Sequence, residues 1–434
     1  MLRRAHCMEA VGFKPWVGGV RRITAALTGY DLSPDGRRVA VWGRSDAPSG
    51  RGPGHTAACL DLATGEITTL LPGEGPILDL RFTGPETLWI LRADATPQHA
   101  TLFVHAIPDG GVLACHTLPG VAPSGKMQWA PGGGRMLIGH DLGPWEDADA
   151  REAALWHLCD GYSADPLARV TPYALWAWSY TSGDTLDLVP WSAARASLCP
   201  DGHRVAVRVD APASGGDGAL VLLEGLDRRG VAFPGRIPPR GLSLVWLGPT
   251  RVAELGLGGG QGLALHLTDA GEAYEARTVP VTAEGRRGPW SPDRATLALS
   301  PDGTRILVSA WRFAGGACWL GVGAVAGRDR DLPMAPVEGS HPRSFAATWL
   351  DPDTLALVVE GAPGRVRVVR YDPVGRRVLG QRSVPFGEGS ELFRLRPVDG
   401  TPGRPPGAWL GLDWYDPTVG GWQLALIPAA ALTG

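Results

Sequence analysis

Lysine is nearly absent from this chain. Of its 41 basic residues, only Lys14 and Lys126 are lysines, and all the others are arginines. A GC-rich coding sequence accounts for this bias, and the alternative is the binding of carboxylates or phosphates by arginine. The formal net charge is only −3 over 434 residues. There is therefore no bulk electrostatic reason to expect nucleic acid or an anionic membrane as a partner.

Cysteine pairs and long apolar runs are also missing. No two of the six cysteines have the C-x-x-C spacing of a metal or redox site. No continuous apolar run follows the basic start at 1–6, as it would in a secretory signal. No run reaches the roughly 18 apolar residues that a membrane span needs. We therefore expect a soluble, cytoplasmic protein with reduced thiols.

Familiar catalytic motifs are absent as well. The sequence has no H-E-x-x-H, no G-x-x-x-x-G-K-[ST], no D-x-D-x-D-G calcium loop and no G-x-S-x-G nucleophile elbow. The ten histidines are dispersed, and the glycine-rich run 256–262 lies between two expected strands, with no helix to bind an anion. The sequence thus predicts no cofactor, no metal site and no catalytic residue. A metal site would need ligands that converge from distant repeats.

What the chain does contain is a recurring turn. Ser-Pro-Asp-Gly stands at 33–36 and 300–303, and Cys-Pro-Asp-Gly at 199–202. An alternating apolar strand follows each turn. Proline fixes φ, aspartate hydrogen-bonds to the backbone, and glycine accepts a positive φ. Weaker variants begin near 83, 130, 247, 350 and 397, which makes eight turns, most of them about 47 to 53 residues apart.

This period predicts the architecture. Several strands per unit of 40 to 50 residues are typical of propeller blades. We expect an all-β fold, a single closed β-propeller over 1–434 with eight four-stranded blades, or seven as the alternative. The last repeat ends one strand short. The segment around 11–20 is expected to pair with the last blade and close the ring, and a disordered leader is the alternative.

The turns at 33–41, 199–207 and 300–308 carry a family resemblance. They resemble the WD40-like propeller repeats of the TolB and dipeptidyl-peptidase IV type, in which a basic residue and a β-branched strand follow Ser-Pro-Asp-Gly. The resemblance implies the fold over nearly the whole chain and names no function. No hydrolase domain is visible after the last repeat, which argues against a peptidase. The export signal and leading α/β domain of TolB-like proteins are not visible either.

An aromatic-rich insertion at 141–192 separates the third and fourth expected blades. Within it, 149–152 has helix-capping spacing, so 153–158 is either a short helix or the third strand of its blade. The rings either form a small core of the insertion or line a surface for a partner. The candidate binding residues are Trp145, Trp156, Tyr173, Trp176, Trp178, Tyr180 and Trp191.

Two functions follow from these features. The first is a non-catalytic scaffold or binding module that engages a protein partner through the loop face and the aromatic insertion. The second is an enzyme, a lyase or hydrolase, with acidic and histidine groups from several blades meeting in the central channel. No feature of the sequence names the partner or the substrate.

Overall fold

The computed structural model describes most of the chain, in segments. The described residues are 12–15, 21–45, 54–70, 75–94, 99–119, 126–129, 135–139, 155–160, 171–174, 178–181, 185–188, 194–200, 204–209, 219–224, 229–232, 240–258, 262–269, 276–284, 290–314, 316–327, 330–343, 345–386, 390–397, 409–418 and 421–432.

The strands follow one another in antiparallel groups. The first groups are β2 (Arg21–Leu32), β3 (Arg38–Ser45), β4 (Gly54–Asp61) and β5 (Ile67–Leu70), then β6 (Ile77–Gly84), β7 (Thr87–Ala93), β8 (His99–Ala106) and β9 (Val112–Pro119), then β10 (Lys126–Trp129), β11 (Arg135–Gly139), β12 (Leu155–Asp160) and β13 (Thr171–Ala174). A separate hairpin consists of β14 (Trp178–Thr181) and β15 (Thr185–Leu188).

The second half of the chain repeats this order. Its first two groups are β16 (Ala194–Leu198), β17 (Arg204–Val209), β18 (Ala219–Glu224) and β19 (Arg229–Ala232), then β20 (Arg240–Trp246), β21 (Arg251–Gly258), β22 (Gly262–Asp269) and β23 (Ala276–Ala283). The next two are β24 (Arg294–Leu299), β25 (Arg305–Arg312), β26 (Ala317–Ala324) and β27 (Leu332–Pro336), then β28 (Ala346–Trp349), β29 (Leu355–Glu360), β30 (Arg365–Asp372) and β31 (Arg377–Pro385). The last group contains β32 (Glu391–Pro397), β33 (Trp409–Asp416) and β34 (Gly421–Pro428).

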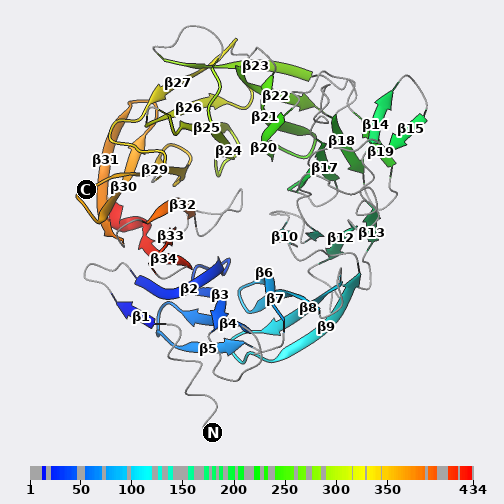
Figure 1. The fold of residues 1–434 in the computed structure, drawn as a ribbon, viewed down its shortest axis with the longest axis vertical. Coiled ribbons are helices and arrows are strands. Elements are labelled where there is room, and N and C mark those ends of the chain that lie inside the picture. Colours follow the sequence, from blue (N-terminus) through cyan, green and yellow to red (C-terminus); the bar gives the residue numbers. More distant parts are fainter. Residues whose placement is uncertain are drawn as a thin grey trace.

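These groups are arranged around a common axis, and the first strand of a group lies nearest the centre, as β6, β10, β20 and β24 do in Figure 1. In the described part of the chain the one helical element is the short 3-10 turn η2 (Ala429–Leu432). None of the described helical residues forms a segment that could cross a membrane. The all-β, propeller-type prediction is confirmed.

The two ends of the chain meet through β2. Its first part, Arg21 to Ile23, pairs antiparallel with β34, and its second part, from Leu27 to Leu32, pairs with β3. The strand β1 (Gly12–Pro15) pairs with β2 rather than with β34. The strand that pairs with β34 thus begins at Arg21, just after the segment 11–20 that was expected to do so. The closed ring and its count of eight blades stay predictions.

The recurring turn is held by a buried side chain at its first position. The Ser300 hydroxyl donates to Asp302 Oδ1 (2.6 Å) and accepts the N–H of Arg305 (2.9 Å), and Ser33 makes the same pair of contacts. At the third turn the Cys199 sulfur accepts the N–H of Arg204 at 3.1 Å. All three first-position residues are completely buried. A thiol therefore replaces the hydroxyl as acceptor without loss of the turn.

The arginine after each of these turns reaches the next group. Its guanidinium donates to the carbonyl of the proline in the following turn, so each contact joins two neighbouring sheets. The pairs are Arg38 Nη1 with Pro85 O at 2.8 Å, Arg204 Nη1 with Pro249 O at 3.2 Å, and Arg305 Nη1 with Pro352 O at 3.5 Å. The basic residue of the motif is thus an inter-sheet contact.

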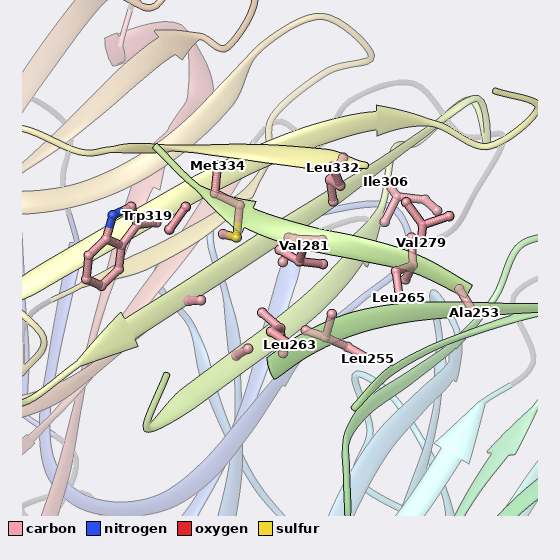
Figure 2. Close-up of a cluster of buried hydrophobic side chains, with 14 of the residues drawn as sticks. Ala253, Leu255, Leu263, Leu265, Val279, Val281, Ile306, Trp319, Leu332 and Met334 are labelled. Carbon is pink, nitrogen blue, oxygen red and sulfur yellow. The ribbon is translucent and has the colours of Figure 1, made fainter. Parts of the chain in front are cut away.

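Apolar packing between sheets supplies the core. Figure 2 shows side chains of β21, β22 and β23 facing those of β25, β26 and β27, with Leu255, Val281 and Met334 among them. Trp290 packs edge-on against Trp319 with ring centroids 4.9 Å apart. Each large side chain buried in this way contributes about 1.5 to 3 kcal/mol. A four-stranded sheet has no other means of covering both faces, so neighbours are required for its stability.

Replacing Ser300 by alanine is expected to lower stability by about 1 to 3 kcal/mol, because the buried N–H of Arg305 loses its acceptor. The Ser300→Cys variant is the matched control, since Cys199 accepts the equivalent N–H. Thermal midpoints of the two variants measure the difference. A cysteine variant as unstable as the alanine variant would contradict the role assigned to the acceptor.

Acid is expected to weaken these turns. The Ser300 hydroxyl holds the pKa of Asp302 below its usual 3.8, and the N–H of Thr64 does the same for the pKa of Asp61. A carboxyl whose pKa is lower in the folded state than in the unfolded state stabilises the fold at any pH above its unfolded-state pKa. This stabilisation is lost as the pH falls through the folded-state pKa. The loss therefore begins near pH 3.8 and continues below it. Melting curves between about pH 6 and about pH 3 should show a smaller acid effect in Ser300→Ala than in the parent.

Candidate functional site

A cavity of about 570 Å³ lies against the inner strands β20, β24, β28 and β32. These strands belong to four consecutive groups, and β20, β24 and β32 run near the centre of the arrangement (Figure 1). Part of β25 completes the wall, together with Pro342, Arg343 and Phe345, which precede β28. Because the wall is assembled from five strands and a loop, its shape is set by the packing of neighbouring sheets.

Arginine dominates the charge of this cavity. Arg294, Arg343 and Arg394 line it, their side chains are exposed, and Asp293 is the one acidic residue among the described lining residues. The carboxylate of Asp293 already accepts the N–H of Phe313 at 2.6 Å. Three guanidinium groups beside one engaged carboxylate favour an anionic ligand.

Aromatic rings form the apolar part of the wall. Phe345 and Phe393 are buried, and Phe345 packs edge-on against Trp311 with centroids 6.2 Å apart. The guanidinium of Arg294 lies over the exposed ring of Phe313 at 5.9 Å. Buried rings hold the apolar surface in place, and exposed arginines stand beside it. The cavity is thus suited to a ligand that has both an anionic and an apolar part.

The lining offers little for catalysis. The hydroxyls of Thr296 and Ser309 are 2.6 Å apart, but no histidine or cysteine is among the described lining residues to activate them. Across the part of the chain that the structure describes, no group of three histidine, cysteine, aspartate or glutamate side chains could hold a metal ion.

A second ionisable group lies on the inner strands β2 and β6. The guanidinium of Arg81 is 3.4 Å from Asp31 Oδ1 and 3.5 Å from Asp79 Oδ2. Asp31 also accepts the N–H of Phe82 and Asp79 that of Met127, both at 2.8 Å. Since inner strands of different sheets do not pair directly, these carboxylates supply the hydrogen bonds between them.

Burial affects the ionisation of this group. Desolvation raises the pKa of Asp31, while Arg81 and the N–H of Phe82 act in the opposite direction. Burial by itself disfavours the charged Arg81, but Asp79 and Asp31 outweigh it and raise its pKa. The group therefore carries a persistent positive charge on Arg81, beside a carboxyl of Asp31 whose pKa is raised by burial.

The candidate residues of the insertion lie in three places. Trp156 on β12 pairs directly with Tyr173 on β13, while Trp178 and Tyr180 lie on β14. The described part of the segment 153–158, from Leu155 onward, lies in β12, which pairs with β11, so it is a strand and not a helix. Trp145, Trp176 and Trp191 lie outside the described residues. Use of these aromatics as a binding surface stays a prediction.

Sequence reasoning missed the residues of both sites. Arg294 and Arg343 belong to different repeats, and so do Asp31 and Arg81. The signal that could have pointed to the cavity was the excess of arginine, for which binding of carboxylates was one interpretation. Nothing in the linear order showed which arginines converge.

No protein-family model and no curated protein sequence matches this chain. Solved structures do match. Sqt1 from Chaetomium thermophilum, bound to the N-terminus of the ribosomal protein L10, has a TM-score of 0.52 at 13% identity, over 93% of this chain and 96% of that one. A eukaryotic initiation factor has a TM-score of 0.51 at 10% identity, over 85% of this chain and 84% of that one.

TolB from Acinetobacter baumannii is also similar, with a TM-score of 0.32 at 14% identity, over 70% of this chain and 67% of that one. Taken together, the structural neighbours are β-propellers, and the resemblance to WD40-like, TolB-type repeats is confirmed. Identities this low show the fold alone, and function has to be argued from the residues of this chain.

Removing the Asp79 carboxylate tests the inner-strand group. The Asp79→Ala variant leaves the N–H of Met127 and part of the Arg81 charge without their partner, so we expect a loss of about 3 kcal/mol. The control is Asp353→Ala, which removes an exposed ion pair with Arg305 and should cost about 0 to 1 kcal/mol. Denaturant unfolding of both variants measures the contrast, and equal losses would show that burial of Asp79 has no special importance.

Proposed function

We propose that this chain is a non-catalytic binding module that engages a protein partner through the ring face that holds the arginine-lined cavity. In this proposal the chain forms one domain over 1–434, a closed ring of eight blades, and the pairing of β2 with β34 supports the closure. The observation that carries the proposal is the cavity itself, where exposed arginines stand beside rigid aromatic walls. Arginine and aromatic residues are enriched at the energetic centres of protein interfaces.

The fold is compatible with this use. The Sqt1 propeller is recorded with the N-terminus of a ribosomal protein, so a ring of this type can hold a segment of another protein. The insertion 141–192, between the third and fourth blades, provides a second contact through its tryptophans and tyrosines. The partner is a protein and not a nucleic acid or a membrane, the module needs no cofactor, and it works in the cytoplasm.

Affinity capture with paired baits tests this function. The parent chain and the Arg294→Glu variant are used to recover proteins from the native source, and bound proteins are quantified by mass spectrometry. We expect at least one protein in near-stoichiometric amount with the parent and at least tenfold less with the variant, because reversal of a central interface charge weakens binding strongly.

The matched control for that capture is Arg377→Glu, which reverses an exposed arginine on the outer strand β31. It should recover the same protein as the parent. Equal capture by all three baits, or no protein recovered by the parent, would count against a partner bound at the cavity.

An enzyme of the lyase or hydrolase class is the second candidate. The observation in its favour is the Asp31–Arg81–Asp79 group, in which burial raises the pKa of one of two neighbouring carboxyls. Turnover of a substrate from a panel of esters, glycosides and uronates, lost in Asp31→Asn, would establish this function and reject the non-catalytic one.

A further inference from the structure

Two arginines of the cavity contrast with the arginines that are held in ion pairs elsewhere in the described structure. Arginine side chains elsewhere commonly have a carboxylate within 4 Å, as do Arg251, Arg305, Arg370, Arg376 and Arg377. Arg294 and Arg343 make no ion pair and no side-chain hydrogen bond with a described residue, although the chain has 44 acidic residues. Their donors are exposed and available to a ligand.

The two arginines approach the cavity from neighbouring groups. Arg294 begins β24, and Arg343 lies in the loop before β28. The wall that they share also contains the exposed ring of Phe313 and the buried rings of Phe345 and Phe393. A planar guanidinium binds a carboxylate through two parallel hydrogen bonds, so this cavity can hold two carboxylates together with an apolar group.

We propose that the cavity recognises an acidic segment of the partner protein that carries an apolar side chain near its carboxylates. This inference rests on the proposed function and names the chemistry of its ligand. The carboxylates bind Arg294 and Arg343, and the apolar side chain packs on the exposed ring of Phe313. A volume of about 570 Å³ is sufficient for a few side chains of an extended segment.

A nucleic acid fits these residues less well. Bases bind by stacking on exposed aromatic faces along a basic groove that follows the phosphates. Here Phe313 is the one exposed ring among the described lining residues, so there is no series of rings on which successive bases could stack. An acidic peptide needs only the two guanidinium groups of Arg294 and Arg343, which the cavity presents.

The test uses the full chain and three fluorescent probes. The first is a blocked peptide of alternating glutamate and leucine, the second is the same peptide with glutamine for glutamate, and the third is a single-stranded oligouridylate. We expect saturable binding of the first probe by fluorescence anisotropy, and binding of the glutamine peptide at least tenfold weaker. Tighter binding of the oligouridylate, or equal binding of both peptides, would overturn the proposal.

Variants locate the binding. Arg294→Glu and Arg343→Glu are each expected to weaken the binding of the glutamate peptide about tenfold or more. Arg294→Lys is expected to weaken this binding less, because a lysine keeps the charge but not the planar pair of donors. The Arg377→Glu control should leave the affinity unchanged. Binding that survives both charge reversals would place the peptide elsewhere and refute this site.

The captured partner separates this inference from the proposed function. If the parent bait recovers a partner and cross-linking maps its bound segment to a stretch without carboxylates, the acidic-segment inference is wrong while the binding function stands. If no partner is recovered but the glutamate peptide binds in an Arg294-dependent manner, the ligand chemistry stands and the function fails.

Discussion

A sheet of four strands cannot bury both of its faces by itself, and this constraint governs the whole molecule. Each sheet is stable because its neighbours cover it, as the buried cluster between β20–β23 and β24–β27 shows (Figure 2). The turn motif serves the same end. Its first residue fixes the local hairpin, and the arginine that follows extends to the proline carbonyl of the next turn. Local and inter-sheet order are thus specified by the same few residues.

The inner strands need hydrogen-bond acceptors that do not come from sheet pairing. They approach one another near the axis without pairing, so their exposed backbone N–H groups need other acceptors. The carboxylates of Asp31 and Asp79 serve on β2 and β6, and the hydroxyl of Ser243 accepts the N–H of Leu297 between β20 and β24. One sector of the axis is therefore tightly connected by charged groups. In the sector of β24, β28 and β32, arginines face a cavity instead.

The sequence was sufficient for the fold because the turn chemistry is local. Proline, aspartate and glycine act within four residues, and Gly36 and Gly303 have the positive φ that the motif requires. Of the two alternatives for 153–158, the strand holds for the described residues, because β12 pairs with β11. Convergence of Arg294 and Arg343 depends on packing between sheets, which the linear order does not encode.

One departure from the regular pattern has a consequence for the rim of the molecule. The outer strands β23 and β27 pair in parallel, with Val281 opposite Leu332 and Ala283 opposite Met334. An unpaired outer strand offers its backbone as a template for a strand of another molecule, which is a common route to aggregation. Over these residues the two edges occupy each other's hydrogen-bonding groups. This stretch of the circumference is thereby closed to intermolecular strand addition.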